Sequence, residues 1–202
     1  MKVGNGMPMS FRAGIVILSV VKNHNNIGTV IMKIPLFEGG SKADGVERKM
    51  QNIDEKYMRA ALALARKAGE QGDVPVGAVI ICGGKIIARA RNEKEKRGDA
   101  CAHAEMLCLN RAQKKLGRWR LSDCTLYVTK EPCAMCAGAL VNCRVGRLVY
   151  GARDERFGCS GSLFDISGDG RLNHAAATCA GVLEADCAAL LSEFFRARRD
   201  NA

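Results

Sequence analysis

Apolar residues recur along the chain with two different periods, one typical of helices and one typical of strands. In residues 58–68 an apolar residue recurs every three or four positions among charged neighbours: Met58, Ala61, Leu62, Ala65 and Ala68. This spacing places the apolar side chains on one face of a helix. We therefore expect an amphipathic helix that begins near Asn52 or Asp54 and ends by residues 69–72, where glycines stand.

Two β-rich runs follow, at residues 76–82 and 85–92. The dipeptide Gly83-Gly84 between them predicts a β-hairpin with a two-residue turn, because glycine adopts the positive φ angles that such turns require. Further runs predict strands at 125–129, 147–151 and 174–182, and helices at 102–116, 132–143 and 185–199. The strand–helix–strand order at 125–151 indicates a crossover with parallel pairing, which is typical of an α/β fold.

Residues 1–49 differ from the rest of the chain. Their apolar run at 14–21 is shorter than the roughly twenty residues of a membrane-spanning helix. No cleavage pattern typical of a secretory signal follows that run. We expect a short strand at 30–36, a glycine-rich linker at 38–44 and a folded domain at 50–202. The N-terminal extension 1–49 is then either disordered or the result of a misassigned translation start; an appended segment or a targeting peptide is the alternative.

The composition narrows the class of protein. A chain of 202 residues suits one domain with a sizeable core. Its ten cysteines follow no secretory signal and form no compact disulfide framework, which favours a reducing cytoplasm with free or metal-bound thiols. The net charge of +10 is compatible with a nucleic-acid partner, although a charge excess is also typical of an ordinary solvated surface. No membrane partner is expected.

Two short segments, with the sequences HAE and PCAMC, carry the residues with the clearest chemistry. They supply one imidazole, from His103, and two thiolates, from Cys133 and Cys136, which are typical zinc ligands. A site with three protein ligands keeps its fourth position for water, and zinc lowers the pKa of that water to near neutrality. Glu105 then suits a catalytic role, carrying protons between the water and a substrate. Both predicted helices that bear these ligands follow a strand or its loop, so their N-termini can meet at one edge of the sheet.

A structural zinc site with four protein ligands is an alternative, since Cys101, Cys108 and Cys143 lie close in sequence to the proposed ligands. A redox pair is a further alternative for the C-x-x-C pattern. Both alternatives leave Glu105 without a task. The proline before Cys133 also suits a first helical position, which would place this thiolate in the first turn, at the positive end of a helix. We therefore prefer the catalytic interpretation.

The spacing H-x-E…P-C-x-x-C is also the signature of the zinc-dependent nucleobase deaminases. Beyond this motif, the chain resembles the bacterial tRNA-specific adenosine deaminases from about Asp54 to Arg199. The segments that carry the resemblance are VPVGAV at 74–79, AHAE at 102–105, TLYVT at 125–129, EPCAMCAGA at 131–139, GARD at 151–154 and CAALLSEFFR at 187–196. The metal motif is common to the whole deaminase superfamily, whereas GARD and the C-terminal segment point to the narrower family.

This resemblance implies a three-layer α/β/α fold of the cytidine-deaminase type, with a central mixed sheet of about five strands. It also implies a zinc-dependent deaminase domain at 50–202 that forms a homodimer with one Zn²⁺ per subunit. The implied reaction is the hydrolytic deamination of adenosine to inosine at the wobble position of a tRNA anticodon stem-loop, with a zinc-activated water.

The resemblance further implies two groups of substrate contacts: Asn92, Val76 and Ala104 around the base, and Asp154, Phe194, Phe195, Arg198 and Arg199 along the RNA strand. Ordinary structural roles are the alternative. Phe194 lies on the apolar face predicted for the last helix, so core packing explains it equally well. Asn92 suits a turn, and Asp154 suits local hydrogen bonds. Arginines at a helix end suit phosphate groups, but also a solvated tail. Cys101 departs from the threonine that family chains commonly have two residues before the histidine.

Two other functions fit part of this pattern. A deaminase of free guanine or another small nucleobase would share the metal motif and the catalytic glutamate. A zinc protein without activity, or an RNA-binding partner, would share the metal motif alone. The aromatic and arginine-rich C-terminal segment favours a polynucleotide substrate, because a free base offers no phosphate to bind.

Overall fold

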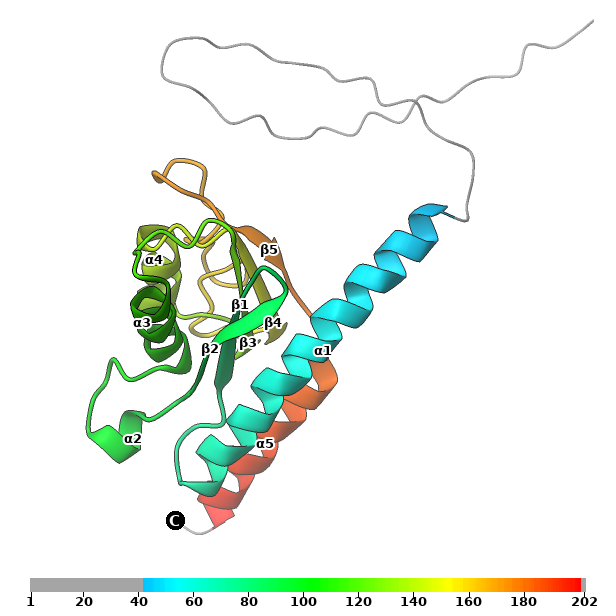
Figure 1. The fold of residues 1–202 in the computed structure, drawn as a ribbon. Coiled ribbons are helices and arrows are strands. Elements are labelled where there is room, and N and C mark those ends of the chain that lie inside the picture. The colour runs from blue at the N-terminus through cyan, green and yellow to red at the C-terminus, as the bar shows by residue number, and fades with distance from the viewer. Residues whose placement is uncertain (1–41, 201–202) are drawn as a thin grey trace, which may run out of the picture. The chain divides into compact units, whose positions relative to one another are not determined.

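The computed structural model describes residues 42–200 of the chain (Figure 1). The apolar run at 14–21 and the short strand expected at 30–36 lie outside the described residues. The chain divides into two units, 1–46 and 47–202, and the elements that position the site lie in the second.

The first helix, α1 (Lys42–Glu70), begins earlier than predicted. The expected start near Asn52 or Asp54 is wrong, and so is the linker at 38–44 as far as it concerns Lys42–Asp44. All residues at 47–53 are exposed. Because this part of the helix has no buried face, it carries no apolar stripe that a periodicity analysis can detect.

Five strands form one mixed sheet in the order β2-β1-β3-β4-β5. The strands are β1 (Gly77–Cys82), β2 (Lys85–Arg91), β3 (Cys124–Lys130), β4 (Arg147–Ala152) and β5 (Ala177–Cys179). Strand β1 pairs antiparallel with both β2 and β3, whereas β3, β4 and β5 pair in parallel. The predicted parallel crossover is thus confirmed. The predicted hairpin is confirmed as well, since Gly83 and Gly84 have φ angles of 55° and 73°.

Helices cover both faces of the sheet, which confirms the expected three layers (Figure 1). On one face lie α3 (Ala104–Leu116) and α4 (Ala134–Asn142), and on the other lie α1 and α5 (Glu184–Asp200). Side chains of β1 alternate between two cores: Ala78 and Ile80 pack with α3 and α4, whereas Val79 and Ile81 pack with α1 and α5. This alternation follows from the two-residue period of a strand.

The structure differs from the predicted elements in one added helix, one shorter strand and two later helix starts. A short exposed helix, α2 (Lys94–Arg97), lies where no element was predicted. Strand β5 covers only the middle of the run predicted at 174–182. Helices α3 and α4 begin two residues later than expected, because the residues before them have extended backbone conformations. Within residues 42–200, the structure contains no helix with the length and apolarity needed to cross a bilayer.

Candidate active site

The three predicted metal ligands converge at the N-terminal ends of α3 and α4. His103 and Cys133 stand at the N-cap positions of these helices, with ψ angles of 151° and 176°, and Cys136 lies in the first turn of α4. The Nδ1 atom of His103 lies 3.7 Å from the sulfur of Cys133 and 3.5 Å from that of Cys136. The three ligand atoms lie within 4.8 Å of one another. Residues that are thirty positions apart in sequence thus form one group.

The expectation that the proline before Cys133 opens the helix is wrong. Pro132 precedes the N-cap, and α4 begins at Ala134. The loop that contains Pro132 is held elsewhere, since the Pro132 carbonyl accepts a hydrogen bond of 2.8 Å from the backbone N–H of Cys159. Cys133 still lies at the positive end of α4, where a thiolate is favoured.

Hydrogen bonds within the group shift the pKa values of the two thiols in opposite directions. The hydrogen bond from Cys136, assisted by His103, outweighs burial and lowers the pKa of Cys133 to about 3. The pKa of Cys136 is raised, because its sulfur lies beside this thiolate and is buried. The hydrogen bond to Cys133 also raises the pKa of His103. A thiolate, a second sulfur and an imidazole that face one another form a donor set that fits Zn²⁺.

The cysteines that a closed four-ligand site would need lie apart from this group. Among residues 42–200, neither Cys101, Cys108 nor Cys143 joins it. Cys101 is exposed, and the thiol of Cys108 donates to the Ala78 carbonyl at 3.6 Å. The sulfur of Cys143 accepts a hydrogen bond of 2.9 Å from the side chain of Gln113.

Glu105 is a buried carboxyl beside the ligand group. Glu105 is only 4% exposed, and its carboxyl lies near Cys136 and His103. Burial raises the pKa of Glu105, so the carboxyl retains a proton more readily than an exposed glutamate does. A buried carboxyl with a raised pKa suits proton transfer at neutral pH.

The residues expected around the base lie close together, since Asn92 is bonded to Val76, and Val76 and Ala104 belong to the same core cluster. The backbone N–H of Asn92 donates to the Val76 carbonyl at 2.9 Å, and Ala104 is fully buried at the start of α3. The Asn92 side chain donates to the carboxylate of Asp73 at 3.3 Å. Asp73 also accepts hydrogen bonds from the backbone N–H groups at the start of α2, at 2.8 and 3.2 Å.

Two buried acids organise the site although no role was predicted for them. Asp73 is 1% exposed and fixes Asn92. Glu131 is 3% exposed and accepts hydrogen bonds of 3.0 Å from the backbone N–H groups of Asp154, Ser160 and Ser162. The side chain of Ser162 donates to it as well. Although burial acts in the opposite direction, these bonds hold the pKa of Glu131 below its ordinary value. The sequence signal for Glu131 was its place directly before the PCAMC segment; Asp73 has no comparable signal.

The residues expected along the RNA strand line one open groove of about 1180 Å³. Its walls include Asp154, Phe194, Phe195, Arg198 and Arg199, together with Lys130 and Arg156. The groove therefore carries four basic side chains and a single acidic one. Lys130 lies three residues before Cys133, which limits the separation of their Cα atoms to about 11 Å. Since Lys130 ends β3 and Cys133 caps α4, one short loop connects the groove to the ligand group.

Asp154 has the local contacts of the structural alternative. Its carboxylate pairs with Lys130 at 2.6 Å and accepts hydrogen bonds from the backbone N–H groups of Arg156 and Phe157 at 3.1 and 3.2 Å. These contacts shape the wall of the groove. They leave a direct contact between Asp154 and RNA as a prediction.

The two phenylalanines of α5 differ in exposure. Their rings pack edge to face, with centroids 5.4 Å apart. The guanidinium of Arg198 lies over the Phe194 ring at 5.1 Å and donates to the Gly72 carbonyl at 3.1 Å. Phe195 is 41% exposed. Phe194 and Arg198 therefore support the groove, while Phe195 offers a partly exposed ring.

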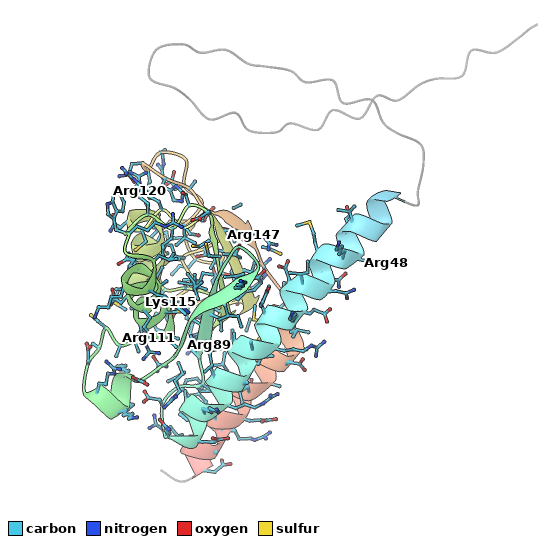
Figure 2. All side chains as sticks on the ribbon, in the orientation of Figure 1. Arg48, Arg89, Arg111, Lys115, Arg120 and Arg147 are labelled. Atoms are coloured by element: carbon cyan, nitrogen blue, oxygen red, sulfur yellow. The ribbon has the colours of Figure 1, made fainter. Side chains whose placement is uncertain are left out.

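Other basic side chains do not line the groove, among them the labelled residues in Figure 2. They come from α1, β2, α3, β4 and the loop before β3: Arg48, Arg89, Arg111, Lys115, Arg120 and Arg147. The positive charge of the chain is thus distributed over several elements. What distinguishes the groove is the combination of basic and aromatic side chains beside a metal-ligand group.

Comparisons with known proteins find deaminases, whose zinc-ligand signature this site carries. The family model described as MafB19-like deaminase matches residues 52–199. A tRNA-specific adenosine deaminase of Bacillus subtilis (strain 168) is 52% identical over 146 residues, which cover 72% of this chain and 91% of that protein. A structure from a study of A-to-I editing by tRNA:A34 deaminases at the wobble position matches with a TM-score of 0.65 and 40% identity, covering 67% of this chain and 99% of that one.

The fold also extends to enzymes with other substrates. A guanine deaminase structure from Nitrosomonas europaea matches with a TM-score of 0.62 and 29% identity, covering 69% of this chain and 83% of that one. This chain is 52% identical to the tRNA-specific relative from Bacillus subtilis, against 29% for the guanine deaminase from Nitrosomonas europaea. The chain therefore belongs to the MafB19-like deaminase family and, within it, to the tRNA-specific adenosine deaminases.

Proposed function

We propose that this chain hydrolyses adenosine to inosine and ammonia at the wobble position of a tRNA anticodon, with one Zn²⁺ per subunit. One observation carries the proposal: a short loop connects a His–Cys–Cys ligand group with a buried glutamate to a groove that is both basic and aromatic. The first part suits hydrolysis of a C–N bond, and the second suits a polynucleotide.

His103, Cys133 and Cys136 would hold the zinc ion. Three protein ligands leave one coordination position for water, and bound zinc would make that water nucleophilic near neutral pH. The depressed pKa of Cys133 supports this assignment, because a thiolate is the form that binds a metal ion.

Glu105 moves the protons of the reaction. It would accept one proton from the attacking water and deliver it to N1 of adenine. It would then take the second proton from the hydroxyl group added at C6 and pass it to the amino group, which leaves as ammonia. The burial that raises its pKa brings the carboxyl closer to the pH at which it must both accept and donate.

The base enters beside Asn92, Val76 and the backbone at Ala104. Asp73 fixes the Asn92 side chain, so this amide is oriented before substrate binds. Such a pocket takes a base that has left the stack, and an anticodon loop supplies bases that are already partly unstacked.

The groove holds the flanking nucleotides. Arg199 and Arg156 suit phosphate groups, and the exposed ring of Phe195 suits stacking with a splayed base. A homodimer and a cytoplasmic location complete the proposal, the first from family membership and the second from the abundance of free cysteines.

The competing function is deamination of free guanine, which the guanine deaminase with the same fold makes a specific alternative. The test offers the purified zinc-loaded protein two substrates: a synthetic anticodon hairpin with adenosine at the wobble position, and free guanine. We expect inosine in the hairpin, measured by mass spectrometry after nuclease digestion, and no ammonia from guanine. Reaction with guanine alone would overturn the RNA assignment, and reaction with neither would support a protein without activity.

A further inference from the structure

A second group of metal-binding side chains lies at the other end of β3. Cys82 ends β1, Cys124 begins β3, and the two residues are direct partners in the antiparallel ladder. The sulfur of Cys82 lies 3.5 Å from one carboxylate oxygen of Asp123, and the sulfur of Cys124 lies 3.7 Å from the other. The ligand atoms of all three residues lie within 4.8 Å of one another.

From this geometry we propose that Cys82, Asp123 and Cys124 form a second metal site, which takes a thiophilic cation such as Zn²⁺ or Cd²⁺. Two sulfur ligands at zinc bond lengths of about 2.3 Å lie about 3.8 Å apart in a tetrahedral arrangement. The ligand atoms of the observed group, which lie within 4.8 Å of one another, are already close to this spacing. Thiolates select thiophilic ions, whereas Mg²⁺ and Ca²⁺ prefer sites made of oxygen ligands.

The side chain of Arg118 shows that this group attracts positive charge. Its guanidinium donates to both carboxylate oxygens of Asp123, at 2.6 and 2.7 Å, and lies 4.0 Å from the sulfur of Cys82. The arginine thus contacts the carboxylate oxygens that would bind the cation. Both partners of this ion pair are substantially exposed, at 40% and 55%, so its displacement by a metal ion costs little.

The second site is separate from the catalytic ligand group. Cys124 and Lys130 stand at opposite ends of β3, about 20 Å apart at the rise of an extended strand. The catalytic cysteines follow the far end of that strand. A cation at Cys82, Asp123 and Cys124 would join the end of the sheet to the loop after α3 and would stabilise the folded chain by binding to it.

The full-length protein with zinc in its catalytic site is dialysed against buffered free Zn²⁺ under reducing conditions, and bound zinc is measured by mass spectrometry. We expect two zinc ions per chain in the wild type and one in Cys82→Ser/Cys124→Ser. The control Cys179→Ser, which removes a thiol that belongs to neither group, keeps two. One zinc ion per chain in the wild type at saturation would overturn the proposal, and so would two in the double variant.

Substitutions of Asp123 and of the neighbouring Arg118, which are both exposed, test the proposal without disturbing the core. Arg118→Ala removes the competing cation, so we expect Cd²⁺ to bind several-fold more tightly, measured by its ultraviolet thiolate charge-transfer absorption. Asp123→Asn removes a ligand and weakens binding. Unchanged Cd²⁺ affinity in both variants would contradict the site. A disulfide between Cys82 and Cys124 in the same reducing buffer would overturn it as well.

Discussion

Arg147 donates two hydrogen bonds of 2.7 Å to the carboxylate of Asp54 and thereby joins β4 to α1. Tyr127 of β3 donates a third, also at 2.7 Å, to the same carboxylate. Asp54 is only 5% exposed. Burial alone would raise the pKa of Asp54, but the hydrogen bonds from Arg147 and Tyr127 hold it below its ordinary value. One polar network therefore ties a helix layer to the sheet.

We expect Asp54→Asn to lower the free energy of unfolding by about 3 kcal/mol at pH 7, because it leaves the partly buried Arg147 without its counterion. The folded state lowers the pKa of Asp54, so the ion pair stabilises the protein above the unfolded value of about 3.9 and is lost as the pH falls through the folded value. Urea unfolding at pH 7 should therefore separate variant from wild type, and the gap should close below about pH 4.

Tyr127→Phe is the control, because it removes one hydrogen bond and keeps the ion pair. It should cost only about 1 kcal/mol at pH 7. A larger loss for Tyr127→Phe than for Asp54→Asn would show that the charge of Asp54 contributes little.

Gly77 allows α1 to pack directly on β1. A Cβ atom added there would lie 2.1 Å from the Ala61 carbonyl oxygen and 2.6 Å from the Ala65 nitrogen. We expect Gly77→Ala to lower the free energy of unfolding by about 2 kcal/mol or more, because backbone atoms cannot yield as a flexible side chain does. Gly138, within α4, has no atom in the way of an added Cβ. Gly138→Ala should raise stability by up to about 1 kcal/mol. The thermal midpoint should therefore fall in Gly77→Ala and rise in Gly138→Ala, as measured by thermal unfolding.

Much of the fold was predictable from the sequence, because it depends on turn residues and on the order of helices and strands. The turn at Gly83-Gly84 depends only on the φ angles of two glycines, and the crossover from β3 to β4 follows from the order of the elements. The first turns of α1 escaped prediction because their side chains touch no core. Periodicity reports burial, so an exposed extension of a helix gives no signal.

The grouping of His103, Cys133 and Cys136 was predictable because few residue types bind zinc and their spacing is characteristic. The contacts of the supporting acids were not predictable, although Glu131 stands directly before the PCAMC segment. Asp73 and Glu131 act through backbone N–H groups that lie far along the chain, and every residue type except proline supplies such a group. The clash at Gly77 is likewise a product of tertiary packing, although its segment was recognised as part of the family resemblance.

Removal of a ligand sulfur should release the catalytic metal. In a Cys82→Ser/Cys124→Ser background, which isolates the catalytic site, we expect Cys133→Ala to reduce bound zinc from about one equivalent to near zero. The thermal midpoint should fall too, since metal binding contributes to folding. Cys159→Ala is the matched control: this thiol is buried and its backbone is bonded to Pro132, yet it lies outside the ligand group. Zinc retained by Cys133→Ala would contradict the assignment.

Glu105→Gln should separate metal binding from chemistry. The amide has the shape of the carboxyl but cannot accept a proton from water, so we expect the rate of inosine formation to fall by about 10³-fold or more. Zinc content and thermal midpoint should stay at their wild-type values, because Glu105 is not a member of the ligand group. If zinc is lost together with activity, the carboxylate maintains the site and its role in proton transfer is unsupported.

Phe195 and Arg199 should contribute to RNA binding by different physical effects. We expect Phe195→Ala to weaken binding of an anticodon hairpin by about 1–3 kcal/mol through lost stacking, with little change in thermal midpoint because the ring is exposed. Phe194→Ala should lower the midpoint as well, since Arg198 packs on its ring. Fluorescence anisotropy and thermal unfolding give the two readouts.

Salt dependence then separates stacking from phosphate contacts. Each phosphate contact releases counterions, so Arg199→Ala should reduce the slope of log affinity against log salt by about 0.7, the value for a single strand. Phe195→Ala should leave that slope unchanged while lowering affinity at every salt concentration, because stacking on a ring displaces no counterion. Equal slopes for Arg199→Ala and wild type would remove this arginine from the RNA interface, and a reduced slope for Phe195→Ala would show that its loss rearranges the basic wall of the groove.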